Sequence, residues 1–329
     1  MHLKTKWILR SIGLILFIII LSRLDLSKLV TLLLNINPYY LILALLLFSP
    51  LLITKAVRWR LLMRGQGIEY SLKDSTTMYA ASMYIGAITP GRLGDFIKVF
   101  YLKEDGYPLG KSFATVLLDR LFDILSLLVL GYAGMLLFMT LFERAIIVLS
   151  LILVATFSLI VFFICKKGLS KRILGYISAN FVPERYKGNA KNWFFDFSNA
   201  IKAIKTSQLI LATFVTFLGW ALYFLIMYLL ALSVDIDISF LYLATCVSIA
   251  AVITLLPISI AGIGTRDAAL IILFSYLGLS RELAIAFSIM ILFMYAVNGF
   301  IGLGAWLKKP VSITGVSGIK KTRDGKNEK

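Results

Sequence analysis

Residues 88–98 read Ile-Thr-Pro-Gly-Arg-Leu-Gly-Asp-Phe-Ile-Lys and lie between the mostly apolar residues 76–87 and the short apolar run 99–102. A proline, two glycines and three charged side chains therefore interrupt a hydrophobic region. Proline removes a backbone donor and glycine favours turns, so we predict that a helix breaks here. Within a membrane, a broken helix is tolerated only where it is buried in protein or lines a wet cavity.

The apolar arms on either side of this break are short. Residues 76–89 and 96–102 cannot each cross a hydrocarbon core of about 30 Å at about 1.5 Å per residue. We therefore predict a re-entrant helical hairpin over residues 76–102, with its tip at residues 90–95. Its hinges are Pro90, Gly91 and Gly94.

A second stretch repeats this composition. Residues 255–268 read Leu-Leu-Pro-Ile-Ser-Ile-Ala-Gly-Ile-Gly-Thr-Arg-Asp-Ala, which predicts a second hairpin over 240–278 with hinges at Pro257, Gly262 and Gly264. Interrupted segments in two halves of a membrane protein point to a transporter-like site. The alternative is a pair of kinks that only pack helices. The arginine and aspartate at each break favour the functional interpretation.

The composition sets the class of protein. The chain has 329 residues, of which 60% are hydrophobic, and its mean hydropathy is +0.90. Globular proteins are nearer half apolar. We predict an all-α polytopic membrane protein with one membrane domain over residues 1–310. The basic, apolar start resembles a signal peptide, but no small-residue cleavage site follows, so we interpret it as a first membrane helix. Besides the hairpins, six spanning helices are predicted over about residues 7–21, 39–57, 112–142, 145–165, 209–232 and 283–307.

The positions of the basic residues predict the orientation. With both termini in the cytoplasm, the outer segments hold only Arg23, Lys28, Arg144 and Arg281, while most other Lys and Arg residues lie in inner segments. This is the positive-inside pattern of a plasma-membrane protein. The two hairpins then enter from opposite faces, as an inverted repeat would produce. Residues 166–207 are predicted to form a cytoplasmic amphipathic loop, and 311–329 a basic disordered tail.

Several function classes find no support. The net charge of +17 fits loops beside anionic lipid rather than nucleic acid. The one histidine is His2, and the two cysteines, Cys165 and Cys246, lie in different apolar segments. This leaves no histidine or cysteine catalytic constellation and no metal spacing, and no nucleotide motif is found. We therefore expect no cofactor, no metal and no enzyme activity.

Charged residues also occur inside a predicted spanning helix. Asp119 lies about 10 Å into a helix that begins near Ser112. Asp123 shares its face, and Arg120 can reach Asp123 at i+3. Such residues are costly in a membrane and normally face a bundle interior or a wet cavity. A structural ion-pair network and a functional site are both compatible, and they can coexist if Asp119 pairs with Arg92 and leaves Arg120 for a ligand.

Guanidinium groups bind phosphate bidentately, and the helix starts after Gly94 and Gly264 add backbone donors for an anion. We predict a lipid phosphate as the ligand. The expected binding residues are Arg92, Lys98, Arg120 and Arg266, and the expected ion-pair or gating residues are Asp95, Asp119, Asp123 and Asp267. Lysine at Arg92 or Arg266 is expected to lower transport while the protein still melts normally. Trp59, beside arginines, is interpreted as an interface anchor, and Tyr79 as a core or interface residue.

Four motifs carry a family resemblance. They are Arg-Trp-Arg-Leu-Leu at 58–62, Thr-Pro-Gly-Arg-Leu-Gly-Asp at 89–95 followed by Lys98, Asp-Arg-Leu-Phe-Asp at 119–123, and Pro-Ile-Ser-Ile-Ala-Gly-Ile-Gly-Thr-Arg-Asp at 257–267. With them the chain resembles the transmembrane region of lysylphosphatidylglycerol synthases, a flippase-like family that includes UPF0104-type proteins. The family often has glutamate where this chain has Asp95, Asp119 and Asp267. The shorter aspartate keeps the charge but reaches less far, so its ion-pair partners can differ from those in the family.

The resemblance implies lipid translocation between leaflets, by a stand-alone member without the soluble synthase domain. Membrane lipids are the expected partners, and a separate lipid-modifying enzyme or glycosyltransferase is compatible with them as a further partner. An anionic or aminoacylated phospholipid and a polyprenyl-phosphate-linked lipid are all compatible substrates. Two alternatives stay open: a membrane-embedded transferase that acts on a lipid-linked substrate, and a non-catalytic membrane scaffold.

Overall fold

A computed structural model describes residues 14–138, 195–255 and 258–310, together with residues 140, 147, 150, 151 and 158. All regular secondary structure in these residues is helical, which confirms the predicted fold class at this level. Most of the predicted span 145–165, Pro257, most of the loop 166–207 and the tail 311–329 lie outside the described part. Residues 14–21 and 195–203 are helical; the further elements are α2 (Leu26–Leu34), α3 (Pro38–Gly65), α4 (Leu72–Ala87), η1 (Pro90–Phe96), α5 (Ile97–Glu104), α6 (Leu109–Leu137), α10 (Thr206–Ser233), α11 (Phe240–Thr254), α12 (Thr265–Ser275) and α13 (Arg281–Lys308).

Three of the described helices, α3, α10 and α13, are long and apolar enough to cross a membrane. Each has 28 residues, which corresponds to about 42 Å at 1.5 Å per residue. The predicted helices lie within these bounds, although α3 continues to Gly65 rather than ending at Val57. The short helix α2 was not predicted. It is capped by Asp25, whose carboxylate accepts a hydrogen bond from the backbone N–H of Lys28 at 3.0 Å.

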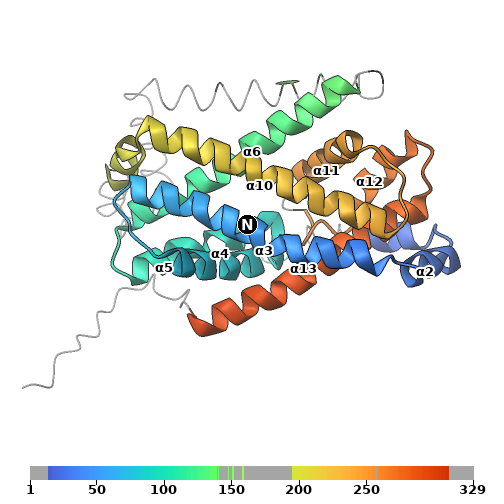
Figure 1. The fold of residues 1–329 in the computed structure, drawn as a ribbon, viewed down its shortest axis with the longest axis horizontal. Helices are drawn as coiled ribbons and strands as arrows, with labels where there is room; N and C mark the ends of the chain where they lie inside the picture. The colour runs from blue at the N-terminus through green and yellow to red at the C-terminus, as the bar shows by residue number, and fades with distance from the viewer. Residues whose placement is uncertain are drawn as a thin grey trace, which may run out of the picture.

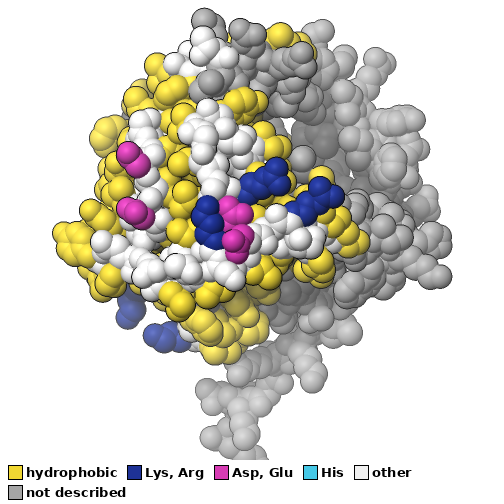
Figure 2. Space-filling view, turned by 90° about the vertical axis from the view of Figure 1, so that its right-hand side faces the viewer, with side chains coloured by type: hydrophobic (Ala, Val, Ile, Leu, Met, Phe, Trp, Pro, Cys, Tyr) yellow, Lys and Arg dark blue, Asp and Glu magenta, His cyan; other side chains and the backbone are white. Residues whose placement is uncertain are grey.

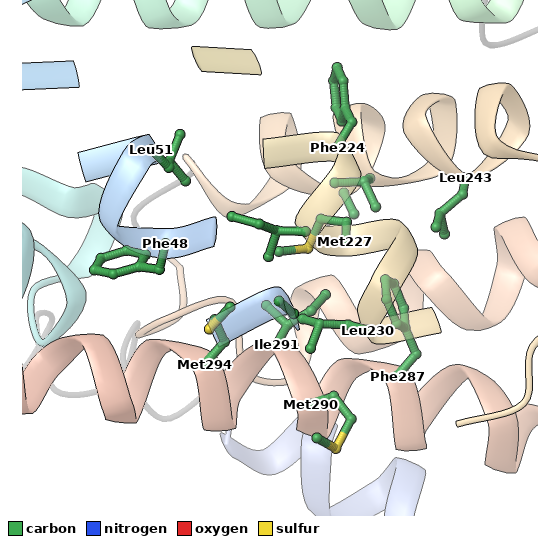
Figure 3. Packing of buried hydrophobic residues seen from close by; sticks show 14 of the residues in the cluster. Phe48, Leu51, Phe224, Met227, Leu230, Leu243, Phe287, Met290, Ile291 and Met294 are labelled. Atoms are coloured by element: carbon green, nitrogen blue, oxygen red, sulfur yellow. The ribbon is translucent and has the colours of Figure 1, made fainter. Parts of the chain in front are cut away.

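The helices α3 and α10 lie side by side along the long axis of the molecule, with α13 below them (Figure 1). Between them pack buried apolar side chains, among them Phe48 and Leu51 of α3, Met227 of α10, and Ile291 and Met294 of α13 (Figure 3). Lipid tails are as apolar as leucine, so close packing rather than escape from water holds such helices together. Small residues at helix contacts should therefore contribute strongly to the stability of the fold.

Gly302 and Gly304 of α13 test this idea as a matched pair. A Cβ atom at Gly302 would lie 2.6 Å from the carbonyl oxygen of Ala80 and 2.7 Å from Cβ of Tyr84, whereas a Cβ at Gly304 has nothing within 4 Å. We expect Gly302→Ala to lower the free energy of unfolding by about 1–3 kcal/mol through overpacking. Gly304→Ala should instead raise it by up to about 1 kcal/mol through helix propensity. Equal melting of the two purified variants would contradict a tight contact between α4 and α13.

The loops gather at two ends of the molecule. At one end, the Tyr70 hydroxyl donates to Asp105 at 2.6 Å, and Nζ of Lys309 lies 3.0 Å from the same carboxylate. Burial raises the pKa of Asp105, but these hydrogen bonds outweigh it and hold the pKa below its ordinary value. The segments predicted to face the cytoplasm thus meet at one end.

The opposite end carries α2 and the start of α13. There the backbone N–H of Asn37 donates to the Ser233 carbonyl at 2.8 Å, and Lys28 lies 3.9 Å from Glu282. Seen face-on in Figure 2, this end shows charged side chains of both signs among hydrophobic ones. The segments predicted to lie outside therefore also share one end of the molecule.

The first predicted break is a real interruption. Between α4 and α5, residues Pro90–Phe96 form the 3-10 helix η1, in which Gly91 and Arg92 take left-handed φ angles of 59° and 56°. The backbone N–H of Gly94 donates to the Thr89 hydroxyl at 2.7 Å. Because Tyr70, before α4, contacts Asp105, after α5, the chain returns to the end from which it came.

The second break has the same form. Between α11 and α12, φ is positive at Ala261 (53°), Gly262 (79°) and Gly264 (81°). The arms are joined where the Tyr242 hydroxyl donates to the Leu273 carbonyl at 2.8 Å. Since α11 starts shortly after Ser233, this hairpin enters the helix bundle from the end opposite to the first.

Candidate functional site

Asp119 on α6 is the centre of a buried ion-pair network. Its side chain is fully buried. One carboxylate oxygen accepts from Nε and Nη2 of Arg58 at 2.9 and 2.7 Å. The other accepts from Nζ of Lys98 at 2.7 Å and from the Tyr79 hydroxyl at 3.3 Å. A buried carboxylate is tolerable only when paired in this way, and here three elements besides α6 supply the partners.

This geometry corrects two predictions and extends a third. Asp119 does not pair with Arg92, whose Nε lies 3.5 Å from Asp95 instead. The reason is that α3 passes α6 and brings Arg58 to the carboxylate first. Trp59 is not an interface anchor: it is 0% exposed, and Nζ of Lys98 lies 5.1 Å from its ring centre. Tyr79 is buried in the core as predicted, but its hydroxyl also belongs to the network.

Arg120 connects the ion-pair network around Asp119 to the first break. Its Nη1 donates to Asp95 of η1 at 2.6 Å, and its Nη2 lies 3.1 Å from Asp123, which confirms the predicted i+3 pair. Asp123 also accepts from Arg58 at 2.6 Å and lies 3.5 Å from Nζ of Lys55. Arg120 is therefore not wholly left for a ligand, because one side of its guanidinium holds the hairpin tip.

The second break has a separate, smaller cluster. The Nε of Arg266 donates to the Ser288 hydroxyl at 2.8 Å, its Nη2 donates to the Ser288 carbonyl at 3.1 Å, and its Nη1 donates to the Ala261 carbonyl at 3.2 Å. Asp267 accepts from the Ser288 hydroxyl and from the backbone N–H of Gly264, the latter at 2.7 Å. Ser288 of α13 thus connects the arginine and the aspartate of the motif.

Both breaks contribute to one partly open cavity of about 360 Å³, a size usual for ligand sites. Most of its wall is apolar, including Phe48 and Leu51. The charged side chains that line it are Lys55, Arg92, Arg120, Asp123 and Arg266. Three of the four predicted phosphate-binding residues therefore meet at this cavity. The fourth, Lys98, is 0% exposed, is engaged with Asp119, and is not part of the wall.

Several polar atoms of the wall residues have no partner. Among the described residues, Nε of Arg92, Nε of Arg120 and Nε1 of Trp220 are buried N–H donors without a hydrogen-bond acceptor. A buried donor left unpaired costs about 1–3 kcal/mol. The wall residue Asn298 also has a buried Oδ1 without a hydrogen-bond donor, so unpaired atoms of both kinds occur around the cavity. In the same part of the chain, no group of three or more His, Cys, Asp or Glu side chains could hold a metal ion.

The residues that sequence reasoning missed are Arg58, Lys55 and Ser288. Arg58 belongs to a quoted motif, but its position near the end of an apolar run suggested the interface. Lys55 follows a continuous apolar segment, and this isolated charge was a usable signal. Ser288 gave no signal, because a serine inside a membrane helix usually bonds to its own backbone.

These features define a helical membrane protein with three candidate membrane-spanning helices, in which two interrupted helical segments, α4–η1–α5 and α11–α12, bring arginines to one cavity. The family follows from comparison with known sequences. The family model described as lysylphosphatidylglycerol synthase TM region matches residues 7–302, and the chain belongs to this family.

Curated relatives carry the name UPF0104 membrane protein. One from Methanocaldococcus jannaschii is 27% identical over 306 residues, which cover 86% of this chain and 88% of the relative. One from Pyrococcus horikoshii is 24% identical over 306 residues, with 85% and 90% covered. One from Methanothermobacter thermautotrophicus is 25% identical over 268 residues, with 76% and 79% covered. These names state a membrane protein and no enzymatic activity.

Proposed function

We propose that this protein moves a phosphate-bearing lipid between the two leaflets of the plasma membrane, with both of its termini in the cytoplasm. The observation that carries the proposal is the mostly apolar cavity lined by Arg92, Arg120 and Arg266 together. A lipid has the same two-part character, an anionic head and apolar chains. Arginine can replace the water around a phosphate with charge-assisted hydrogen bonds.

The hairpins support a mechanism of translocation. In this proposal both are re-entrant, and each tip brings an arginine toward the middle of the bundle from one end, as in transporters whose broken helices meet at a central site. The left-handed residues Gly91, Arg92, Gly262 and Gly264 serve as hinges. Asp95 and Asp267 hold the arginines beside them and release them when a head group competes.

A leaflet-resolved assay tests the proposal. Purified protein is placed in liposomes with a fluorescent phosphate-bearing lipid, and the fraction exposed to a membrane-impermeant quencher is followed over time. Arg92→Lys should slow movement at least about tenfold, equivalent to 1.4 kcal/mol, because lysine keeps the charge but loses the planar fork. Since Arg92 is 36% exposed with one ion pair of 3.5 Å, its melting should not change.

The matched control is Arg23→Lys, an exposed residue at the opposite end from Tyr70, which should transport at the wild-type rate. Wild-type transport by Arg92→Lys would remove that arginine from the site. A covalently new lipid product would indicate a transferase instead, and the absence of both movement and product would indicate a scaffold. The acyl or polyprenyl nature of the chains, and any partner enzyme that supplies the lipid, can be tested in the same assay.

A further inference from the structure

The charges around the cavity do not balance. Among the described residues, five cations and three carboxylates are connected by contacts within 4.0 Å. The cations are Lys55, Arg58, Arg92, Lys98 and Arg120, and the carboxylates are Asp95, Asp119 and Asp123. Arg266 and Asp267 form their own pair at 3.5 Å and add no net charge. The connected network therefore has two positive charges in excess.

The excess is divided between the two sides of the network. Arg58 and Lys98 are 2% and 0% exposed and both contact the buried carboxylate of Asp119, while Arg58 also contacts Asp123 at 2.6 Å. The remaining cations, Lys55, Arg92 and Arg120, all line the cavity. Their nitrogen atoms lie 2.6 to 3.5 Å from the carboxylate oxygens of Asp95 and Asp123, so three cations are paired with two carboxylates.

Uncompensated charge is expensive away from water, because little solvent is present to screen it. The buried Nε donors of Arg92 and Arg120 also have no acceptor among the described residues. A ligand that brings two negative charges to this wall would balance the charge of the whole connected network. A phosphodiester brings only one charge, and an aminoacylated head group with a free amine adds positive charge to a wall already in excess.

We propose that the cavity selects a dianionic phosphate group, either a phosphomonoester or a diphosphate, over a monoanionic phosphodiester. This inference rests on the proposed function, since the same cavity would hold the head group. The dianion could be carried by a lipid or be free in solution. The shared chemistry is a terminal phosphate with two negative charges near neutral pH.

Binding to the purified full-length protein in detergent micelles tests this selectivity. The probes are dioctanoyl phosphatidic acid, a monoester, and dioctanoyl phosphatidylglycerol, a diester with the same chains. At pH 7 the monoester should bind at least about tenfold more tightly, equivalent to 1.4 kcal/mol. The preference should shrink as the pH falls through the second ionisation of the monoester, near pH 6. Glycerol 3-phosphate, a soluble monoester with the same dianionic group, distinguishes the source: binding as tight as the lipid's indicates a free dianion, and much weaker binding a lipid-borne one.

A charge variant tests the cause of the preference. Lys55→Gln reduces the excess to one positive charge and should bring the two lipids to within about threefold of each other. Arg23→Gln removes the same charge at an exposed position and should leave the preference unchanged. The pH dependence in the wild-type protein keeps the test independent of whether Lys55→Gln folds.

The possible outcomes separate the two proposals. Equal affinity of the wild-type protein for the monoester and the diester at pH 7 would overturn the dianion inference and leave transport of a phosphate lipid standing. Tighter binding of a lysyl-phosphatidylglycerol probe than of either would overturn it as well. If no anionic lipid binds and none moves in liposomes, both proposals fall.

Discussion

The substitution Asp119→Asn is expected to lower the free energy of unfolding by about 3–5 kcal/mol, the usual cost of breaking a buried ion pair from one side. Asparagine has about the same size as aspartate but lacks the negative charge with which Arg58 and Lys98 form ion pairs, each at 2.7 Å. Both cations are almost completely buried, so neither can turn to water. Thermal or denaturant unfolding of the purified protein measures the loss.

Two controls make this experiment specific. Asp237→Asn, the same exchange at an exposed loop position, should leave stability within about 0.5 kcal/mol. Adding Lys98→Met to Asp119→Asn should restore part of the lost stability, because a buried cation without a partner is replaced by an apolar side chain of similar length. If Asp119→Asn melts like the wild-type protein, the network does not stabilise the fold.

The second large effect is expected for Arg266→Lys. Arg266 donates through three different nitrogen atoms, two of them to Ser288 and one to the Ala261 carbonyl, at 2.8 to 3.2 Å. A single ammonium group cannot replace this fork. Each hydrogen bond lost from a charged group costs about 1.5–3 kcal/mol, so we expect a drop in stability of at least that size.

Arg92→Lys is the matched control for this prediction, because the two arginines occupy corresponding places in the two hairpins. Arg92 is 36% exposed and has one ion pair of 3.5 Å, so its exchange should change stability by less than about 1 kcal/mol. The sequence alone suggested normal melting for both variants. The hydrogen bonds of Arg266 instead predict that Arg266→Lys melts at a lower temperature than the wild-type protein. Equal melting of both variants would show that Arg266 does not hold the second break.

The sequence predicted the parts of the fold that local chemistry specifies. Proline and paired glycines within apolar runs located both breaks, because no other residues tolerate the left-handed angles of Gly91 or Gly262 as easily. Helical spacing placed Arg120 beside Asp123. The three long helices α3, α10 and α13 followed from hydropathy and length. That the hairpins are re-entrant in a membrane stays a prediction.

The sequence could not predict contacts between helices. Arg58 and Asp119 are 61 positions apart, and nothing in either neighbourhood specifies which helix faces which. An arginine and a tryptophan near a helix end usually mark the membrane surface, whereas here Arg58 and Trp59 are buried. Lys98 looked like a cavity residue because it follows the break, but its helix turns it toward Asp119.

The separation of the Asp119 partners also bears on how the chain is inserted during synthesis. Lys98 precedes Asp119 by 21 positions and Arg58 precedes it by 61. A nascent chain therefore presents Arg58 to the insertion machinery long before its carboxylate partner has left the ribosome. Arg58 begins about 30 Å along α3 from Pro38 at 1.5 Å per residue, where a long side chain can stay in the head-group layer. Its entry into the interior must then wait for α6, which makes the docking of α3 a late step of biogenesis.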